Sequence, residues 1–185
     1  YQLKKICNKK LLTNNIKKQY KNYAILTLHR PSNVDDEKTL TKIINIINQL
    51  SKKIFFIFPI HPRTKKKLIS YNLNLSKNVI LTKPLSYNNF LNLLVDSKII
   101  LTDSGGVQEE ASVLNIPCLT LRNNTERPMT ITHGTNQLVN LDKKSIISSF
   151  NNKLNSVKKR VVKHKVWDGH AADRISKTIF KILIN

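Results

Sequence analysis

Short, almost continuously apolar segments recur along the chain. They are bounded by polar or proline-containing stretches and lie at residues 23–28, 53–62, 79–81, 99–102 and 116–122. Strands covered on both faces of a parallel sheet have this composition, whereas strands with one wet face alternate apolar and polar residues. The pattern therefore predicts a buried parallel sheet.

Amphipathic segments separate these strands. The three- and four-residue spacing of one helix face is found in Leu40, Ile43, Ile44, Ile47 and Leu50, which predicts a helix within residues 31–52. Further helices are predicted at residues 63–73, 87–95, 107–115 and 145–160. Strands that alternate with helices predict an α/β fold, a Rossmann-like parallel sheet with helices on both faces.

The two ends of the chain depart from this pattern. Residues 1–22 are polar and rich in lysine, which predicts a leader or a linker helix. Residues 167–185 predict an amphipathic C-terminal helix with Asp168 as its cap. One face of that helix would carry Ala171, Ile175, Ile179 and Leu183. Residues 23–166 form the expected central domain.

Length and composition bound the class of protein. The 185 residues suffice for one domain with a substantial core. No N-terminal apolar signal and no apolar run of the roughly 18 residues needed to span a membrane is found, so we expect a soluble, cytoplasmic protein without a membrane partner. Cys7 and Cys118 are far apart, which predicts two unpaired thiols. No metal-ligand cluster is evident, and we expect neither a metal nor another cofactor.

The net charge of +21 raises the question of nucleic-acid binding. Only six of the 32 cations are arginines, the side chains suited to bidentate contacts with phosphates and guanine. Lysine is spread along the chain, and the runs at residues 65–67 and 158–160 are typical of solvated helix faces. We therefore expect no nucleic-acid partner.

Candidate chemistry is concentrated in LTDSGGVQEE, residues 101–110, which holds two of the four glycines. A predicted strand ends there and a helix follows, and ligands of open α/β sheets bind beyond the carboxyl ends of strands. Without Cβ atoms, Gly105 and Gly106 let a ligand approach the backbone closely. The N–H groups at the positive end of the helix favour a phosphate.

A glutamate pair follows this turn. Glu110 lies four residues after Gly106, one turn along the same helix face, where its carboxylate can accept hydrogen bonds from two vicinal hydroxyls. A phosphate and a diol at this spacing describe a nucleotide. The alternative is a tight strand–helix connection in which Glu109 and Glu110 only complement the helix dipole in the first turn. SGG is a short signal without the glycine patterns of dinucleotide or P-loop sites, so both interpretations stay open.

Longer blocks of the sequence resemble a known family. LTDSGGVQEEASVLNIPCLTLRNNTERPMTITHGTNQLV is similar to the signature of the non-hydrolysing UDP-N-acetylglucosamine 2-epimerases. LTLHRPSNVDD, FPIHPRTKK and WDGHAADRI resemble other blocks of that family in the same order, so the resemblance covers residues 23–183. It implies a glycosyltransferase-B-like architecture in which this chain is the C-terminal, nucleotide-holding domain.

The resemblance implies roles for the residues of the turn. Ser104, Gly105 and Gly106 match the residues that hold the UDP phosphates, and Glu110 matches the glutamate that holds the ribose. Its position agrees with the one inferred from spacing alone.

Two further residues match nucleotide-binding positions of the family. Phe90 of YNNF occupies the place of the aromatic residue beside uracil, although it could equally belong to the helix core. Arg127 of TERP matches an arginine at the phosphates or their surroundings, and its alternative partners are Glu126 and Asp103. The THGTN segment around Gly134 is expected to shape a loop.

The resemblance also implies that His29 is the catalytic residue of this half, near the sugar and the diphosphate. It ends a predicted strand, where a side chain points into the ligand crevice. Arg30 is expected to clamp a phosphate or to pair with Asp35. His61 ends the next strand and is expected to line the same crevice and to contact UDP.

The family's reaction, as the resemblance implies it, inverts C2 of the sugar. A C2 proton is removed and UDP is eliminated, then UDP is added back, which interconverts UDP-GlcNAc and UDP-ManNAc. The catalytic carboxylates belong to an N-terminal Rossmann domain that this sequence does not contain. We therefore expect a UDP-sugar-binding half that needs that partner, covalently or in trans, and is inactive alone.

The origin of such a half is open. The chain could be a fragment, one product of a split gene or a stand-alone remnant, and a homodimer is open for the full-length enzyme. The C-terminal helix is expected to pack against the N-terminal domain and to expose apolar surface without it. A non-catalytic UDP-sugar-binding remnant and one half of a glycosyltransferase-B enzyme are the alternative functions.

Overall fold

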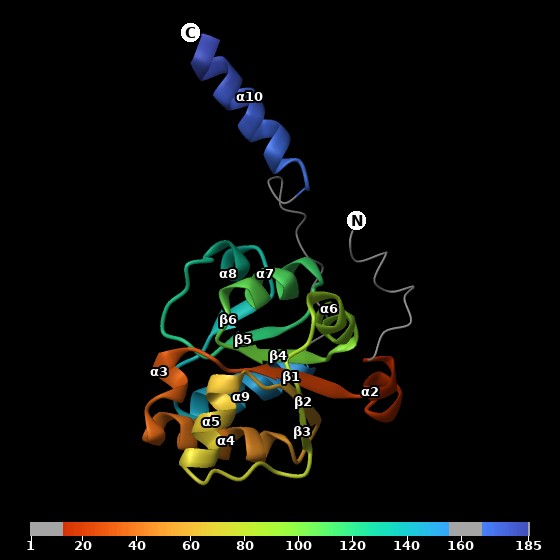
Figure 1. Cartoon of the computed structure of the whole chain (residues 1–185), viewed down its shortest axis with the longest axis vertical. Helices are drawn as coiled ribbons and strands as arrows, with labels where there is room; N and C mark the ends of the chain where they lie inside the picture. The colour runs from red at the N-terminus through yellow and green to blue at the C-terminus, as the bar shows by residue number, and fades with distance from the viewer. Residues whose placement is uncertain (1–12, 156–167, 185) are drawn as a thin grey trace.

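The computed structural model describes residues 13–155 and 168–184 (Figure 1). A parallel sheet forms the centre of the molecule, with the strand order β3-β2-β1-β4-β5-β6. The strands are β1 (Tyr23–Thr27), β2 (Phe55–Pro59), β3 (Val79–Thr82), β4 (Ile99–Thr102), β5 (Cys118–Thr120) and β6 (Asn136–Leu138). Every apolar segment predicted to be a strand contains one. The short, partly polar β6 was not predicted.

The described helices are α2 (Asn14–Gln19), α3 (Pro31–Val34), α4 (Glu37–Leu50), α5 (Pro62–Ser70), α6 (Tyr87–Asp96), α7 (Gly105–Val113), α8 (Met129–Thr132), α9 (Lys143–Asn155) and α10 (Ala171–Ile184). α7 begins at Gly105, two residues before the predicted start. The predicted helix at residues 145–160 corresponds to α9, and residues 156–160 lie outside the described part.

The single helix expected within residues 31–52 is two helices. Pro31 occupies the first turn of α3, where its missing N–H group is tolerated. Asp36 lies between α3 and α4 in an extended conformation, and its carboxylate accepts a hydrogen bond from the N–H of Thr39 at 2.8 Å. The chain therefore restarts as α4 at a capped N-terminus. The apolar face of α4 is buried as its periodicity predicts.

Two apolar clusters cover the two faces of the sheet. On one face, α4, α5 and α9 pack over alternate strand residues such as Leu26 and Phe58. On the other face, α6 and α7 cover the intervening residues, among them Ile25 and Ile100. Figure 1 shows the two helix layers on opposite sides of the strands. Burial on both faces explains why the strands are continuously apolar.

The N-terminal segment is partly integrated into the domain. Residues 1–12 lie outside the described residues, but α2 packs beside α6, where the Thr13 hydroxyl donates to the Asn92 side chain at 2.8 Å. The ring of Tyr20 packs on that of Phe55, with their centroids 5.0 Å apart. Residues 13–22 thus pack against the edge of the domain.

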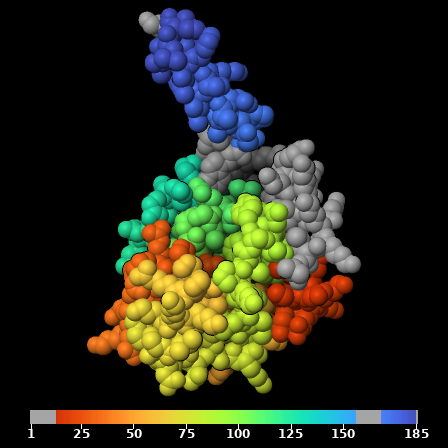
Figure 2. Space-filling view, in the orientation of Figure 1, coloured from red at the N-terminus to blue at the C-terminus, as the bar shows by residue number. Residues whose placement is uncertain are grey.

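The C-terminal helix α10 stands away from the domain (Figures 1 and 2). None of its described residues is buried, and Ile175, Ile179 and Leu183 are exposed, as expected from the sequence. Asp168 is not the flanking cap that its position suggested. Its carboxylate accepts from the His170 N–H at 2.9 Å and pairs with Arg174, which braces the start of the helix.

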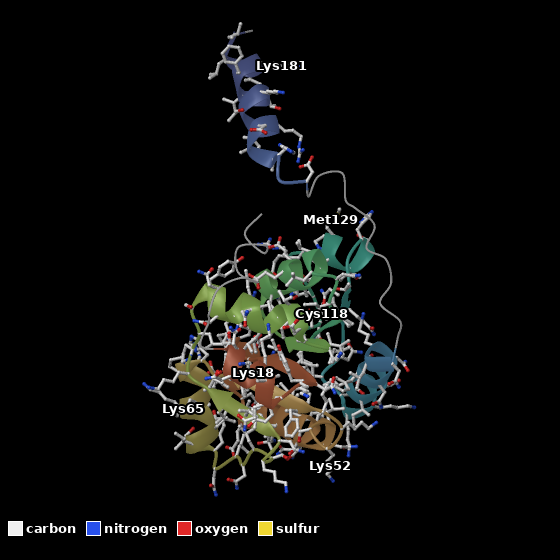
Figure 3. The ribbon with its side chains drawn as sticks, turned by 90° about the vertical axis from the view of Figure 1, so that its right-hand side faces the viewer. Lys18, Lys52, Lys65, Cys118, Met129 and Lys181 are labelled. Atoms are coloured by element: carbon white, nitrogen blue, oxygen red, sulfur yellow. The ribbon has the colours of Figure 1, made fainter. Side chains whose placement is uncertain are left out.

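The remaining sequence-based expectations concern the surface and the thiols. Figure 3 labels Lys18, Lys52, Lys65 and Lys181, which lie on or beside separate elements of the chain. Cys118 is buried, and burial raises the pKa of its thiol to about 12, so it stays protonated; Cys7 lies outside the described residues. Each helix in the described part of the chain is too short or too polar to cross a bilayer.

Candidate functional site

The site lies where the strand order reverses, between β1 and β4. Successive connections leave the sheet in opposite directions there, which opens a crevice at the carboxyl ends of these strands. The Thr27 and Thr102 hydroxyls hydrogen-bond to each other across the two strand ends at 2.6 Å. The turns that follow these threonines therefore lie side by side.

A pocket of about 220 Å³ opens at this point. It is lined by Thr27, Leu28, His29, Pro59, His61, Pro84, Leu85, Phe90, Ser104 and Val107. Larger hollows, of about 970 and 680 Å³, lie on α4 and beside β6, and no residue of α7 or of the β1 and β4 ends lines them. Chemistry and topology rather than volume therefore identify the small pocket as the candidate site.

The buried carboxylate of Asp103 organises the crevice. It follows β4 directly and is fully buried. Its Oδ2 accepts hydrogen bonds from the backbone N–H groups of His29 at 3.0 Å and Arg30 at 2.9 Å. It also accepts one from the side-chain amide of Asn33 at 3.3 Å. Asn33 also donates to the carbonyl of Leu121 at 3.0 Å. The connection after β1 is thereby tied to the ends of β4 and β5.

Asp103 also orients the ring of His29. Its Oδ1 lies 2.9 Å from Nδ1 of His29, whose side chain is 40% exposed. Burial alone would raise the pKa of Asp103, but hydrogen bonds from the His29 side chain and from the backbone of Arg30 and His29 hold it below its usual value. An ionised Asp103 accepts a hydrogen bond from the Nδ1–H group of His29, which leaves Nε2 as the nitrogen that can act on a ligand.

The two glycines of the turn lie at the start of α7. Gly105 and Gly106 are the first helical residues, so their N–H groups have no partner within the helix. Ser104 precedes them; its N–H donates to the Thr102 hydroxyl at 2.9 Å, and its own side chain makes no capping bond. A Cβ on Gly106 would meet no atom within 4 Å. Space, donors and the positive end of α7 therefore coincide here.

The two glutamates lie in different surroundings. Neither is in the first turn of α7, so they do not simply complement its dipole there, as the alternative interpretation assumed. Burial, and then the charge of Glu109, raise the pKa of Glu110 to about 7. Glu109 instead pairs with Arg127, with Oε1 3.0 Å from Nε. The helix thus presents one carboxylate paired with an arginine and one half-buried carboxylate without a cationic partner among the described residues.

The TERP segment lies against the start of α7. Arg122, only 11% exposed, makes two hydrogen bonds to Glu126, at 2.8 and 2.9 Å. Hydrogen bonds from Arg122 lower the pKa of Glu126 to about 2. Arg30 also approaches this carboxylate, at 3.6 Å. One Glu126 oxygen would be 3.9 Å from a Cβ on Gly105, which places the cluster beside the glycine turn.

These contacts correct the pairings considered from the sequence. Arg30 does not pair with Asp35, because Asp35 pairs with Arg63 on α5. Arg127 pairs with Glu109 rather than with Glu126 or Asp103.

The remaining candidates lie where the sequence placed them. His61 precedes α5, its Nδ1 accepts the N–H of Arg63 at 3.2 Å, and its ring is 6.0 Å from that of His29. Both histidines line the same pocket. Phe90 packs on the core and also lines the pocket. Gly134 shapes a loop, since a Cβ there would lie 2.3 Å from the Ser112 hydroxyl.

Sequence reasoning missed the residues that hold the site together. Asp103 was considered only as a partner of Arg127, and Arg122 and Asn33 were not considered. The usable signal was a charged residue just beyond a buried strand: Asp103 directly follows β4, and Arg122 lies two residues after β5. Among the residues with described positions, no group of three or more His, Cys, Asp or Glu side chains could hold a metal ion.

Comparison with known proteins adds to this geometry. The family model described as UDP-N-acetylglucosamine 2-epimerase matches residues 1–180. A UDP-N-acetylglucosamine 2-epimerase of Methanococcus maripaludis is 42% identical over 169 residues, which cover 88% of this chain and 43% of the relative. One of Methanocaldococcus jannaschii is 45% identical over 161 residues, or 83% of this chain and 43% of the relative. The chain thus spans less than half the length of these relatives.

Solved structures agree. The M. jannaschii UDP-GlcNAc 2-epimerase in complex with UDP-GlcNAc and UDP superposes with a TM-score of 0.83 at 36% identity, covering 97% of this chain and 51% of that one. The Neisseria meningitidis enzyme bound to UDP-GlcNAc superposes with a TM-score of 0.74 at 28% identity. The match covers 97% of this chain and 52% of that one. An Escherichia coli heptosyltransferase shares the fold alone. It is 14% identical, with a TM-score of 0.54, and the match covers 71% of this chain and 43% of that one. The predicted Rossmann-like, glycosyltransferase-B-like fold is confirmed.

Proposed function

The chain belongs to the UDP-N-acetylglucosamine 2-epimerase family, and we propose that it is the UDP-sugar-binding half of such an enzyme. The observation that carries this proposal is the start of α7. Two glycine N–H groups without helical partners lie there beside open space, and the half-buried Glu110 follows one turn along. Solved members of the family hold UDP-GlcNAc or UDP, which supports the same ligand class here.

The diphosphate is assigned to the glycine turn. The N–H groups of Gly105 and Gly106 would donate to its oxygens, with the unengaged hydroxyl of Ser104 beside them. Arg30 and Arg127 are the proposed cationic partners, and both have exposed guanidinium groups held by a carboxylate in the free chain. A diphosphate would share or replace those carboxylate contacts.

The nucleoside is assigned to α7 and α6. The Glu110 carboxylate would accept hydrogen bonds from the two ribose hydroxyls, which fits a group that lacks a cationic partner among the described residues. Phe90 would lie against the uracil ring, because its side chain already lines the pocket. In this proposal the diphosphate lies at the turn and the ribose lies one helical turn further along α7.

His29 is the proposed catalytic residue of this half. In the elimination, the C2–H bond breaks, its electrons form a C1–C2 double bond, and the C1–O bond to UDP breaks. With Nδ1 held by Asp103, the Nε2 atom of His29 would stabilise or protonate the departing diphosphate, and His61 would line the same wall. The base that removes the C2 proton belongs, in this proposal, to the N-terminal half.

That missing half is the proposed partner of α10. The exposed apolar side chains Ile175, Ile179 and Leu183 form a face that would be buried against it. Closure of two halves would also exclude water from the sugar. The homodimer, the cytoplasmic location and the absence of a nucleic-acid partner stay predictions.

Deuterium incorporation at C2 of UDP-GlcNAc in heavy water tests the proposal. The 185-residue chain alone should give no exchange above a protein-free blank. Mixing or fusing it with the N-terminal half of the M. jannaschii relative should restore exchange, and His29→Ala should then abolish it. Exchange by the chain alone, lost in His29→Ala, would show that this half carries its own base.

A further inference from the structure

Two buried amide side chains meet beneath the TERP segment. Gln108 of α7 is fully buried, and Asn136 of β6 is 4% exposed. The Nδ2 of Asn136 donates to Oε1 of Gln108 at 3.1 Å, and its Oδ1 accepts from the Thr120 hydroxyl at 2.6 Å. The amides thus link the second turn of α7 to the edge of the sheet.

Both backbone polar groups of Arg127 are held by this amide pair, each through one hydroxyl. Thr125 Oγ1 accepts the Arg127 N–H at 3.0 Å and donates to Gln108 Oε1 at 2.6 Å. Thr130 Oγ1 donates to the Arg127 carbonyl at 2.7 Å and accepts from Asn136 Nδ2 at 3.0 Å. The backbone at Arg127 is therefore fixed relative to α7.

The Gln108 side chain carries an energetic penalty for this arrangement. Its Nε2 is buried without a hydrogen-bond partner among the described residues, while its oxygen receives two bonds. A buried donor left unpaired is destabilising, and an apolar side chain of similar shape would avoid that loss. Departures from the most stable choice are expected where function requires them.

We propose that Gln108 and Asn136 are positioning residues of the nucleotide site. They hold the Arg127 backbone so that its guanidinium, now on Glu109, reaches a diphosphate bound at the start of the same helix. Fixing the segment before binding lowers the ordering cost of binding. This inference rests on the proposed UDP site and adds the residues that act through Arg127.

A matched pair of variants at Thr125 tests the link with little risk to folding. Thr125→Val keeps the shape but removes the hydroxyl that joins Gln108 to Arg127, whereas Thr125→Ser keeps the hydroxyl. By calorimetry, Thr125→Val should bind UDP roughly 3- to 10-fold more weakly than wild type, and Thr125→Ser should stay within about 2-fold. Equal affinities for all three chains would overturn the inference.

A second comparison separates positioning from general destabilisation. Gln108→Met removes one buried amide, and Asn92→Leu removes another, on α6, that binds Thr13. Asn92→Leu should lower stability without weakening UDP binding, whereas Gln108→Met should weaken UDP binding whether or not it lowers stability. Equal weakening by both would mean that any loss of packing has this effect.

A double-mutant cycle identifies the route. In an Arg127→Gln background, Thr125→Val should cause almost no further loss of UDP affinity, because the residue it positions is gone. Fully additive losses would show that the network acts elsewhere. If the wild-type chain itself binds no UDP, the proposed function fails and the inference with it. If wild type binds UDP and Thr125→Val binds it equally well, only the inference fails.

Discussion

Nδ1 of His29 lies 2.9 Å from Oδ1 of Asp103, and the two residues follow the neighbouring strands β1 and β4. The same carboxylate accepts the backbone N–H groups of His29 and Arg30. Asp103 therefore fixes both the position and the tautomer of the histidine. His29 lines the pocket, and the fully buried Asp103 holds its ring in place.

Asp103→Asn should destabilise the chain. The amide NH₂ would face backbone donors of His29 and Arg30 that now meet a carboxylate, so the free energy of unfolding should fall by about 1–3 kcal/mol. Denaturant unfolding followed by circular dichroism measures this. Asp35→Asn is the control, because it removes a partly exposed ion pair with Arg63 and should shift the midpoint little. Similar shifts in both variants would contradict the assignment of Asp103 as the organiser.

The effect of Asp103 should depend on pH with a defined sign. Its folded-state pKa is lowered, so its contribution is complete above the unfolded value of about 3.9 and is lost as the pH falls through the lower folded value. The difference in unfolding free energy between wild type and Asp103→Asn should therefore be constant near neutrality and shrink in acid. A difference that grows on acidification would contradict a lowered pKa.

The two glutamates of α7 should differ in their effect on UDP binding. Glu110→Gln removes charge-assisted hydrogen bonds to the ribose diol and should weaken binding by about 1–2 kcal/mol. Glu109→Gln should weaken it less, because Glu109 is engaged with Arg127 rather than facing the ribose. Calorimetric titration of both variants decides the matter. Equal losses, or a larger loss at Glu109, would mean that the ligand-facing side of α7 is assigned wrongly.

Glu110 should also make UDP binding sensitive to pH. Burial and Glu109 raise its pKa to about 7, so it is largely protonated at pH 6 and ionised at pH 8 in the free chain. Only the ionised form accepts hydrogen bonds from both hydroxyls with full charge, so affinity should rise over this interval. Glu110→Gln is the control, since the UDP phosphate itself titrates near pH 6. A pH dependence identical in wild type and Glu110→Gln would exclude this role.

Alanine substitutions at Gly106 and Gly134 should have different effects, because Gly106 is proposed to contact the ligand and Gly134 is closely packed in a loop. Gly106→Ala adds a Cβ that meets no atom in the free chain, so stability should be unchanged or slightly higher, while UDP binding should weaken because the ligand approaches the backbone there. Gly134→Ala should lower the thermal stability of the chain, because the added Cβ would lie 2.3 Å from the Ser112 hydroxyl. Thermal unfolding and UDP titration together test both. Undiminished UDP binding by Gly106→Ala would argue against a phosphate at this turn.

Much of the fold follows from local patterns. Continuous apolar runs predict β1 to β5 because burial on both faces leaves no place for polar side chains. β6 could not be predicted in this way because it has only three residues. Its Asn136 is a polar side chain whose burial is stabilised by hydrogen bonds, so it gives no apolar signal in the sequence. The break before α4 depends on the capping carboxylate of Asp36. In the sequence, this single capping residue is a weaker signal than the helical periodicity of the residues that follow it.

The candidate site likewise has a part that could be predicted from the sequence and a part that could not. The glycine turn and Glu110 could be predicted because they lie on one helix, where spacing fixes geometry. Partners such as His29 and Asp103, or Arg127 and Glu109, meet only through the sheet or a returning loop. Their contacts depend on the order of strands, which spacing along the chain does not specify. Arg122 and the Gln108–Asn136 pair were missed for the same reason.

The most direct test of the central claim is a titration of the isotope-labelled chain with UDP, followed by amide chemical shifts. The account predicts saturable shifts at Gly105, Gly106 and Glu110, with amides on the far side of the sheet, such as those of α9, unchanged. Affinity is expected to be weak, because half of the crevice belongs to the N-terminal domain in the proposal. The absence of any shift at Gly105 and Gly106 at millimolar UDP would contradict the claim that this chain holds the nucleotide.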